Sequence, residues 1–397
     1  MKRLLGLLLA VACGLGAQVE TDVERLVQGN NQFTVAFYRE LSTSPGNIVV
    51  SPFNLSTTLA MAYLGARGTT AQQMEAVLHY GADTPDELSA AFGNLLGRLQ
   101  AENLKLANSL WIDKRLPVLF LYKSLVNRSF HGGIHEISFA DPSFATAEIN
   151  RWVTSQTAGK IGELLQPGTL TSAARLVLVS AITMNGEWLH PFDTGRTRTQ
   201  PFYVTTQKRV SAPMMNTQGQ FLYSKEQGYA LLALPYRRGV TGPNLSMVIL
   251  LPDAGDGLAA LERQLSADQI ETALIGAAAR RVDVTLPKFR LSNRIYARHF
   301  LEKMGMTAPF TTAADFSGIT GRQDLAISAA VHQAYIDVDE VGTEAAAATA
   351  VTMTPKSAPL GPEVAFNADR PFLYLILDTE TKQFLFIGRV VNPVGES

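Results

Sequence analysis

The stretch that decides the fold is Glu340-Val-Gly-Thr-Glu-Ala-Ala-Ala-Ala-Thr-Ala-Val-Thr-Met-Thr-Pro-Lys-Ser-Ala-Pro-Leu360. It has almost no large side chains, and it lies between two segments with the residue pattern of β-strands. A structureless connection of about twenty residues inside a compact domain is usually either functional or disordered. From Thr343 to Thr352 every residue except Glu344 is Ala, Thr or Val, whereas Pro355 and Pro359 prevent continuous pairing further on. The first half can therefore become a strand, and the second half cannot.

This stretch resembles the hinge and reactive-centre loop of the inhibitory serpins, protease inhibitors that trap serine proteases covalently. The matching hinge residues are Glu340, Gly342, Thr343, Glu344, Ala345, Ala346, Ala347 and Ala348. The resemblance covers about residues 22–393 and includes six further motifs in the order of the family. These motifs are Asn47-Ile-Val-Val-Ser-Pro52, Asn185-Gly-Glu-Trp188, Leu286-Pro-Lys-Phe289, Ala314-Asp-Phe-Ser-Gly318, Phe366-Asn-Ala-Asp-Arg-Pro-Phe-Leu-Tyr-Leu-Ile376 and Phe384-Leu-Phe-Ile-Gly-Arg-Val-Val-Asn-Pro393.

The resemblance implies an α+β fold with a single serpin-type domain over residues 18–397. It further implies a large central β-sheet, two smaller sheets, about eight or nine helices and an exposed reactive-centre loop at about 340–362. The residues alone give the same class, because strand-like and helical patterns occur without an internal repeat or a regular βαβ alternation. The run Leu176-Val-Leu-Val-Ser-Ala-Ile182 is almost wholly apolar, which predicts a central strand covered on both faces.

The function implied by the resemblance is that of a serine protease inhibitor acting as a suicide substrate. The target would cut the loop between Lys356 and Ser357, form an acyl-enzyme, and be trapped when the loop inserts as a new strand of the main sheet. A lysine before the cut suits trypsin-like proteases. Cleavage between Ser357 and Ala358 stays open and would favour elastase-like or subtilisin-like targets.

Two other classes of function are weaker. A non-inhibitory serpin, acting as carrier or chaperone, would be expected to carry large or charged residues or proline in the hinge, whereas this hinge, apart from its two glutamates, has only Val, Gly, Thr and Ala. An enzyme is not predicted, because no catalytic motif is present in the sequence. No cofactor is predicted either. His131 and His135 have the spacing of a metal-binding pair, but the glycines between them disfavour the helix that such a pair needs, so no metal is expected.

The resemblance assigns Ser51, Asn54, Ser180 and His332 to a polar cluster called the shutter, and Trp188 to a region called the breach. Most serpins have serine at the position of Asn54 and asparagine at the position of Ser180, so the two residue types are exchanged here. Two interpretations of Asn54 stay open. Its amide reaches Ser180 or His332 and closes the hydrogen-bond network from the helix side, or it only caps the second helix.

The N-terminus predicts export of the protein. Met1-Lys2-Arg3 and the short apolar run that follows have the pattern of a signal peptide over residues 1–17. The only cysteine, Cys13, lies in a stretch that resembles a bacterial lipoprotein signal, in which the thiol is lipidated, and the other interpretation is a cysteine removed with the signal. We therefore expect a secreted or extracytoplasmic protein, a bacterial exported member of the family, whose folded domain contains no disulfide.

Charge limits the choice of partners. The formal net charge of −1 argues against nucleic acid as a partner. Heparin-activated serpins carry a basic patch between the fourth helix and the strand that follows it. This chain has only Lys105 there, so activation by heparin is not expected. The expected partner is a trypsin-like serine protease, bound covalently by a monomer of the inhibitor.

Overall fold

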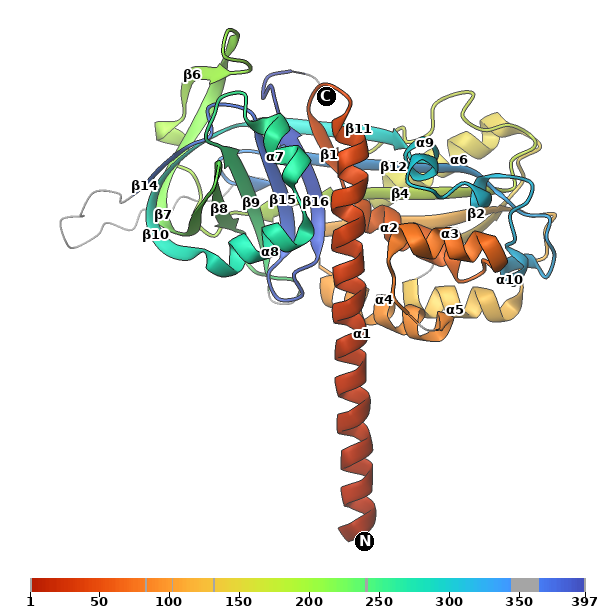
Figure 1. The fold of residues 1–397 in the computed structure, drawn as a ribbon. Coiled ribbons are helices and arrows are strands. Elements are labelled where there is room, and N and C mark those ends of the chain that lie inside the picture. The colour runs from red at the N-terminus through yellow and green to blue at the C-terminus, as the bar shows by residue number, and fades with distance from the viewer. Residues whose placement is uncertain are drawn as a thin grey trace.

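The computed structural model describes residues 2–82, 84–101, 103–130, 133–239, 242–343 and 364–395, with side chains from Glu20 onward. Within these residues the chain forms ten α-helices around two β-sheets (Figure 1). The helices are α1 (Lys2–Ser42), α2 (Pro52–Tyr63), α3 (Gly68–Leu78), α4 (Pro85–Leu99), α5 (Phe120–Phe130), α6 (Pro142–Gln156), α7 (Leu258–Gln264), α8 (Ala267–Gly276), α9 (Arg298–Lys303) and α10 (Ser317–Thr320). Two short 3-10 helices are η1 (Thr194–Arg196) and η2 (Ala308–Phe310).

The strands are β1 (Ile48–Val50), β2 (Leu104–Asp113), β3 (Ile134–Ile137), β4 (Leu176–Met184), β5 (Gly186–Glu187), β6 (Arg198–Tyr203), β7 (Arg209–Glu226), β8 (Tyr229–Pro235), β9 (Leu245–Pro252), β10 (Ala278–Pro287), β11 (Phe289–Tyr296), β12 (Ile327–Val338), β13 (Gly342–Thr343), β14 (Val364–Asn367), β15 (Phe372–Asp378) and β16 (Phe384–Val390). The nine-stranded sheet has the order β1-β16-β15-β9-β8-β7-β10-β14, with β6 also paired to β7. The seven-stranded sheet has the order β3-β2-β4-β12-β13-β5, with β11 also paired to β12.

Local sequence accounts for the first two helices. Helix α1 ends just before Pro45 and Gly46, and the positive φ of +99° at Gly46 suits a residue without a side chain. Helix α2 begins at Pro52, and the Ser51 hydroxyl caps it by accepting a 3.2 Å hydrogen bond from the Asn54 N–H. The predicted apolar stripe of α1 is buried, and it consists of Val23, Leu26, Val27, Phe33, Phe37 and Leu41.

Strand β4 is the centre of the seven-stranded sheet, and all nine of its residues are buried. Leu178 and Ile182 belong to the main core, which also contains the apolar side chains of α2. Val177 and Val179 face the other way and pack in a second core with the buried face of α6. Helices therefore cover both faces of β4, which confirms the prediction made from its continuous apolar run.

The comparison with the expected fold gives agreement in class and a difference in detail. The α+β class is confirmed. In the described part of the chain, the two smaller sheets form one nine-stranded sheet, because the 18-residue strand β7 pairs with β6 at its start, with β10 along its middle and with β8 at its end. The ten helices exceed the expected number because α9 and α10 are short elements of six and four residues.

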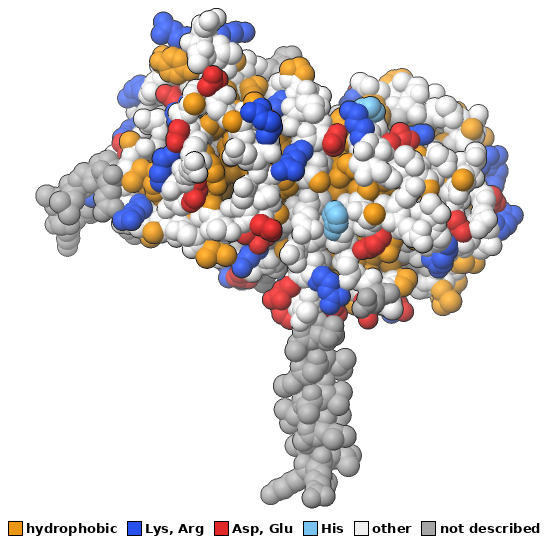
Figure 2. Space-filling view, in the orientation of Figure 1, with side chains coloured by type: hydrophobic (Ala, Val, Ile, Leu, Met, Phe, Trp, Pro, Cys, Tyr) orange, Lys and Arg blue, Asp and Glu red, His pale blue; other side chains and the backbone are white. Residues whose placement is uncertain are grey.

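Basic and acidic side chains are interspersed on the face of the molecule shown in Figure 2, which agrees with the small net charge. Among the residues whose side chains are described, no helix is long and apolar enough to span a membrane.

Candidate functional site

The hinge residues Gly342 and Thr343 form β13, a two-residue strand inside the seven-stranded sheet. Thr343 pairs with Val338 of β12 on one side and with Gly186 of β5 on the other. Because β5 continues the direction of β4 after one intervening residue, β13 lies between the extension of β4 and β12. The hinge therefore occupies the place where a strand inserted between β4 and β12 would begin.

Close packing requires a glycine at position 342. A Cβ atom there would lie 2.7 Å from the Cα of Glu187 and nearer still to the carbonyl oxygen of Gly186. The turn before it is shaped by Asp339, whose Oδ1 accepts hydrogen bonds from the N–H groups of Val341 (2.9 Å) and Gly342 (3.1 Å). Any larger residue at position 342 would push β13 away from β5.

Thr343 is fully buried, and its Oγ1 lies 2.7 Å from the hydroxyl of Tyr236. The ring of Tyr236 stacks on Trp188 with the centroids 4.4 Å apart. Trp188 also holds the hinge segment directly, because its backbone N–H donates to Val341 O (2.8 Å) and its indole Nε1 donates to Asp339 O (2.9 Å). Trp188 thus lies against the hinge, and Tyr236, which the sequence reasoning missed, completes the contact. Burial raises the pKa of Tyr236, so its phenol stays protonated.

Glu340 anchors the chain just before the hinge. Its carboxylate forms an ion pair with Lys288, whose Nζ lies 2.7 Å from Oε2. Its Oε1 accepts a 2.8 Å hydrogen bond from Thr197 Oγ1. Burial raises the pKa of Glu340, but the hydrogen bonds from Lys288 and Thr197 outweigh burial and hold this pKa below its ordinary value. Neither partner was predicted, although Lys288 lies within one of the motifs that carry the resemblance.

Strands β4 and β12 are parallel neighbours, and the line along which they pair is here called the seam. It runs from Leu176 paired with Ile327 to Thr183 paired with Tyr335. An entering strand would have to separate β4 from β12 along this length, since a hydrogen-bonded pair leaves no room between its strands.

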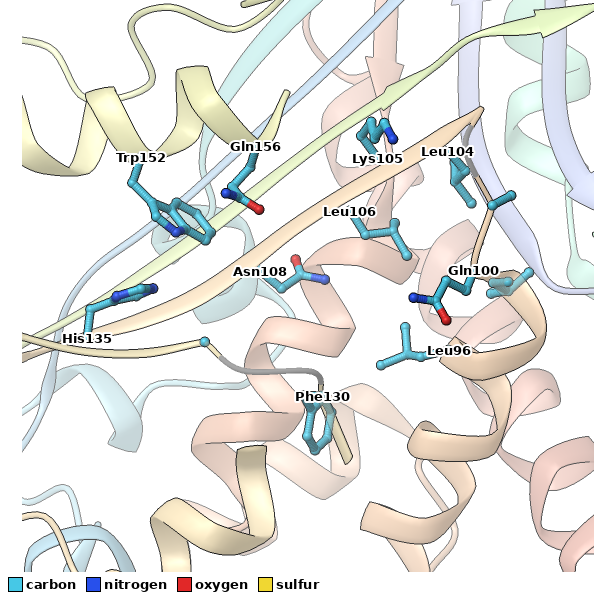
Figure 3. Close-up of a pocket in the computed structure, with 13 residues that line it drawn as sticks. Leu96, Gln100, Leu104, Lys105, Leu106, Asn108, Phe130, His135, Trp152 and Gln156 are labelled. Atoms are coloured by element: carbon cyan, nitrogen blue, oxygen red, sulfur yellow. The ribbon is translucent and has the colours of Figure 1, made fainter. Parts of the chain in front are cut away.

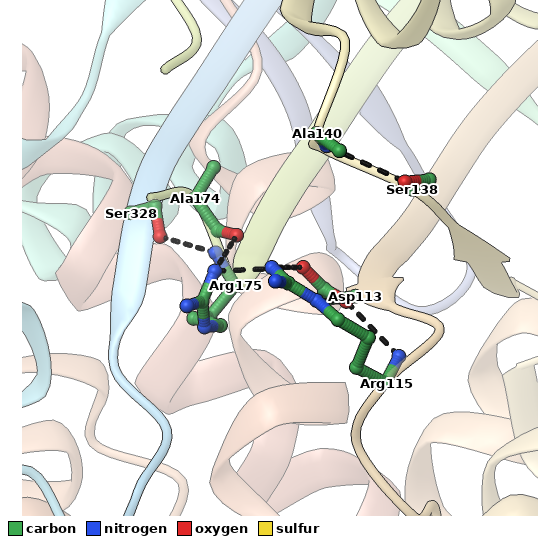
Figure 4. A network of polar contacts seen from close by, with 7 residues as sticks. All are labelled: Asp113, Arg115, Ser138, Ala140, Ala174, Arg175 and Ser328. Atoms are coloured by element: carbon green, nitrogen blue, oxygen red, sulfur yellow. Dashed lines mark hydrogen bonds and ion pairs between the residues drawn. The ribbon is translucent and has the colours of Figure 1, made fainter. Parts of the chain in front are cut away.

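The end of the seam farthest from β13 is closed by side chains (Figure 4). The pairing of β12 with β4 is irregular at Ser328, whose hydroxyl accepts a 2.9 Å hydrogen bond from the Arg175 N–H. Beside it, the fully buried carboxylate of Asp113 accepts a 2.8 Å hydrogen bond from Arg115 Nε and lies 3.5 Å from Arg175 Nη1. The hydrogen bonds from Arg115 hold the pKa of Asp113 below its ordinary value. The sequence reasoning missed this group.

The four predicted shutter residues lie together at the middle of the seam, and all are fully buried. Asn54 Nδ2 donates to Ser180 Oγ (2.9 Å) and to the carbonyl oxygen of Ala181 (3.0 Å). Ser180 Oγ lies 2.9 Å from His332 Nδ1, and the N–H of Ser51 donates to His332 Nε2 (3.0 Å). Of the two interpretations of Asn54, the structure favours the bridge to the sheet, because Ser51 supplies the cap of α2.

These contacts define the proton on His332. The backbone N–H of Ser51 can only donate, so Nε2 must be the acceptor and the proton of the neutral ring lies on Nδ1, directed at Ser180. Burial lowers the pKa of His332 to about 3. A proton on Nε2 would place two donors face to face, so the cluster requires the neutral ring.

This requirement predicts that acid destabilises the native state. An unfolded histidine binds a proton below a pH of about 6.5, whereas the folded one does so only near pH 3. The stability of the native state therefore decreases as the pH is lowered from 6.5 to 3. We expect the free energy of unfolding, measured with urea, to decrease by about 1.4 kcal/mol per pH unit below 6.5 from this group alone.

The matched variant is His332→Gln, whose amide can accept from Ser51 and donate to Ser180 without titrating. Its stability should depend less steeply on pH from 6.5 to 5 than that of the wild type. Burial also lowers the pKa of His135, which both proteins retain, so the difference between them isolates His332. Equal slopes would contradict the assignment.

Two further members of the polar cluster escaped prediction. Asn108 Nδ2 donates to Asn54 Oδ1 (2.7 Å), and Thr58 Oγ1 donates to Asn108 Oδ1 (2.9 Å). Asn108 pairs with Ser180 across β2 and β4, and Ser180 pairs with His332 across β4 and β12. The polar row therefore crosses three adjacent strands. An asparagine within the largely apolar strand β2 was the signal that could have revealed it.

Asn108 also lines a cavity of about 420 Å³ between α4, α5, α6 and β2 (Figure 3). Apolar side chains, among them those of Leu96, Leu106 and Phe130, form much of its wall. His135 lines it too and stacks on Trp111, with the ring centroids 4.4 Å apart. His135 is thus packed among aromatic rings. In the part of the chain that is described, no three His, Cys, Asp or Glu residues are grouped to hold a metal.

Several predicted residues lie outside the described residues. They include the rest of the hinge and the reactive bond, namely Glu344, Ala345, Ala346, Ala347, Ala348, Lys356 and Ser357, as well as His131. The side chain of Cys13 is likewise outside the described part of the chain.

Comparisons with known proteins agree with this geometry. The profile of the family described as "Serpin (serine protease inhibitor)" matches residues 28–393. A serpin-like protein of Thermococcus kodakarensis is 38% identical over 383 residues, which cover 94% of this chain and 87% of that protein. The leukocyte elastase inhibitor of Equus caballus is 35% identical over 387 residues, covering 94% of this chain and 100% of the relative.

Solved structures give the same result. Serpin48 of the insect Tenebrio molitor superposes with a TM-score of 0.82 at 31% identity, covering 93% of this chain and 98% of that one. Uncleaved ovalbumin also has a TM-score of 0.82, at 29% identity and with 93% and 100% coverage. Relatives named for an activity are named as protease inhibitors, which confirms the prediction that the chain is not an enzyme.

Proposed function

This chain belongs to the serpin family, and we propose that it inhibits serine proteases as a suicide substrate. The observation that carries the proposal is the position of β13 between β5 and β12. A strand begun there can lengthen only by parting β4 from β12, and serpin loop insertion is a known case of strand addition and of released strain. The seam described above is then the track of the inserted loop.

The chemistry belongs to the target protease. Its serine attacks the carbonyl carbon of Lys356, the bond to Ser357 breaks, and the amine of Ser357 leaves while the lysine stays esterified to the enzyme. The cut frees the end of the loop. Insertion then competes with hydrolysis of the ester, and the protease is trapped when insertion is faster.

The pairing of β13 indicates how far the loop would reach. In an antiparallel pair, one residue forward on one strand is matched by one residue backward on the other. Thr343 pairs with Gly186, so continuing the same pairing places Met353 opposite Leu176. Leu176 is the last residue of β4 along this direction. The esterified Lys356 would lie three residues further, roughly 40 Å from Thr343, since a strand rises about 3.3 Å per residue. The protease would be carried past the far end of the seam.

The composition of the loop suits insertion. With a period of two, one face of the new strand would carry Thr343, Ala345, Ala347, Thr349, Val351 and Met353, none of which is charged. Thr343 is already buried on this face. Glu344 would point to the other face, so the inserted strand would bury no charge on the face that carries Thr343.

The targets proposed are trypsin-like proteases, because Lys356 would enter a specificity pocket with a carboxylate at its base. The inhibitor is proposed to act as a monomer, exported by its signal peptide at residues 1–17 and, if Cys13 is lipidated, anchored to lipid. The relatives reported above come from an archaeon and animals and give no support to a bacterial origin.

Incubation of the mature protein with trypsin-like proteases is expected to give a complex that survives denaturing electrophoresis. Mass spectrometry of the released C-terminal peptide should show that it starts at Ser357. A peptide that starts at Ala358 would move the reactive bond and direct the search to elastase-like or subtilisin-like proteases. Cleavage of the loop by every protease tested, without any stable complex, would refute inhibition.

A further inference from the structure

Three consecutive large apolar side chains are exposed where α5 begins. The exposed fractions are 42% for Leu119, 80% for Phe120 and 80% for Leu121. Helix α5 packs against the core through other residues, such as Tyr122 and Val126, so these three side chains do not serve the packing of the helix. Clustered exposed apolar groups of this size mark interaction surfaces. The three residues are here called the apolar ridge.

The apolar ridge lies at the end of the sheet where the seam finishes. Strand β2 ends beside Leu176, since Ile112 pairs with that residue, and the chain then turns and leads to the ridge within a few residues. The Leu119 N–H donates to the carbonyl oxygen of Ile319 (2.8 Å) in α10, the helix that precedes Ile327 at the start of β12. Figure 1 shows α10 and α5 at this end of the seven-stranded sheet.

The chain beyond β13 indicates what would cover the ridge. If the loop inserts in the pairing begun by Thr343, the seam is filled at Met353, and Lys356 emerges from the same end of the sheet. A protease esterified to Lys356 is held there by a tether of only three residues, about 10 Å when extended. It must therefore rest against whatever surface surrounds that end.

We propose that the apolar ridge is the surface on which the esterified serine protease rests after loop insertion. This inference rests on the proposed function. The contact would be mainly apolar, and two basic side chains that flank the ridge in the sequence are engaged in ion pairs, Arg115 with Asp113 (2.5 Å) and Lys123 with Glu136 (2.9 Å). The ridge would thus buttress the trapped enzyme and oppose the recovery of its active conformation, with little dependence on salt.

The test uses the full-length mature inhibitor carrying Phe120→Ser and Leu121→Ser. Both side chains are largely exposed, so the fold should be preserved. We expect the rate of association with trypsin to be unchanged and the covalent complex to form. Active trypsin should then be released from the purified complex about tenfold to a hundredfold faster than from the wild-type complex, since each of the two lost apolar contacts contributes up to about a tenfold factor.

The matched control is Ile275→Ser in α8, which removes an apolar side chain of 75% exposure from a helix that lies beside the nine-stranded sheet, away from α5 and α10 (Figure 1). It should release trypsin at the wild-type rate. Normal complex formation with wild-type release from the ridge variant would overturn this inference and leave the proposed function standing. Failure of the wild type to form any complex would refute the proposed function itself. A self-association of the wild type that the ridge variant loses would assign the ridge to a second copy of the chain and also overturn the inference.

Discussion

Replacement of Thr343 by arginine is expected to turn the inhibitor into a substrate. Thr343 is fully buried with its Oγ1 2.7 Å from the Tyr236 hydroxyl, so the new side chain would have to bury a charge in the first pair of the inserted strand. An unpaired buried charge costs at least several kcal/mol, and each 1.4 kcal/mol slows a step about tenfold. Slower insertion leaves more time for hydrolysis of the ester. The number of inhibitor molecules consumed per trypsin molecule inhibited should rise about tenfold or more.

Thr343→Ser is the control for this prediction. It keeps the hydroxyl that contacts Tyr236 and adds no volume, so its stoichiometry should stay close to that of the wild type. The measurement is a titration of trypsin with each variant, followed by electrophoresis of the products. An unchanged stoichiometry for Thr343→Arg would show that insertion does not require an uncharged side chain at position 343.

The second large effect is expected in the shutter cluster. Asn54→Ser removes the amide that bonds both Ser180 and Ala181, and Ser180→Asn crowds that amide with a second one. Each single change should lower the free energy of unfolding by about 1 to 3 kcal/mol, because a buried polar group is left without a partner or is displaced. The double variant restores the arrangement usual in the family, and its stability should approach that of the wild type.

Urea unfolding of the four proteins gives the coupling energy directly. Asn94→Ser is a suitable control, because the Asn94 side chain is exposed and its amide donates to the carbonyl oxygen of Ala90 within its own helix. Its effect should add to that of Ser180→Asn. If the losses at positions 54 and 180 are also strictly additive, the two residues do not share a network, and the 2.9 Å contact between them does not govern stability.

Features with a local cause could be predicted from the sequence. The Ser51-Pro52 start of α2, the apolar stripe of α1 and the buried run of β4 depend on neighbours in the chain, and each is found as expected. The joining of two sheets through β7 was not predictable in this way. The residue pattern of a strand shows which face is buried, but it does not show which strand pairs with it when that strand is as far away in the sequence as β10 is from β7.

The candidate site could also be predicted only in part. The resemblance named Ser51, Asn54, Ser180 and His332, but it could not decide where the Asn54 amide points, since this depends on β4 lying opposite α2. Asn108 and Tyr236 were missed for the same reason. Each is a single polar residue within a strand or just after one. Its role depends on a partner more than 50 residues away in the sequence, which is Asn54 for Asn108 and Thr343 for Tyr236.

The central claim is that inhibition requires β4 to separate from β12. Ala181 and Gln333 are paired across the seam, and residues paired directly across neighbouring strands lie close enough for a disulfide. Since Cys13 is the only cysteine, Ala181→Cys and Gln333→Cys in a Cys13→Ala background give a single reversible lock.

The measurement is the fraction of trypsin converted to the denaturant-resistant complex by the oxidised and the reduced form of this variant. We predict that the oxidised form is cleaved in the loop and forms almost no complex, because the closed seam excludes the new strand. Reduction should restore the complex, and either single-cysteine variant should be insensitive to oxidation. Equal amounts of complex from the oxidised and reduced forms, with the disulfide verified, would contradict the claim that the loop enters between β4 and β12.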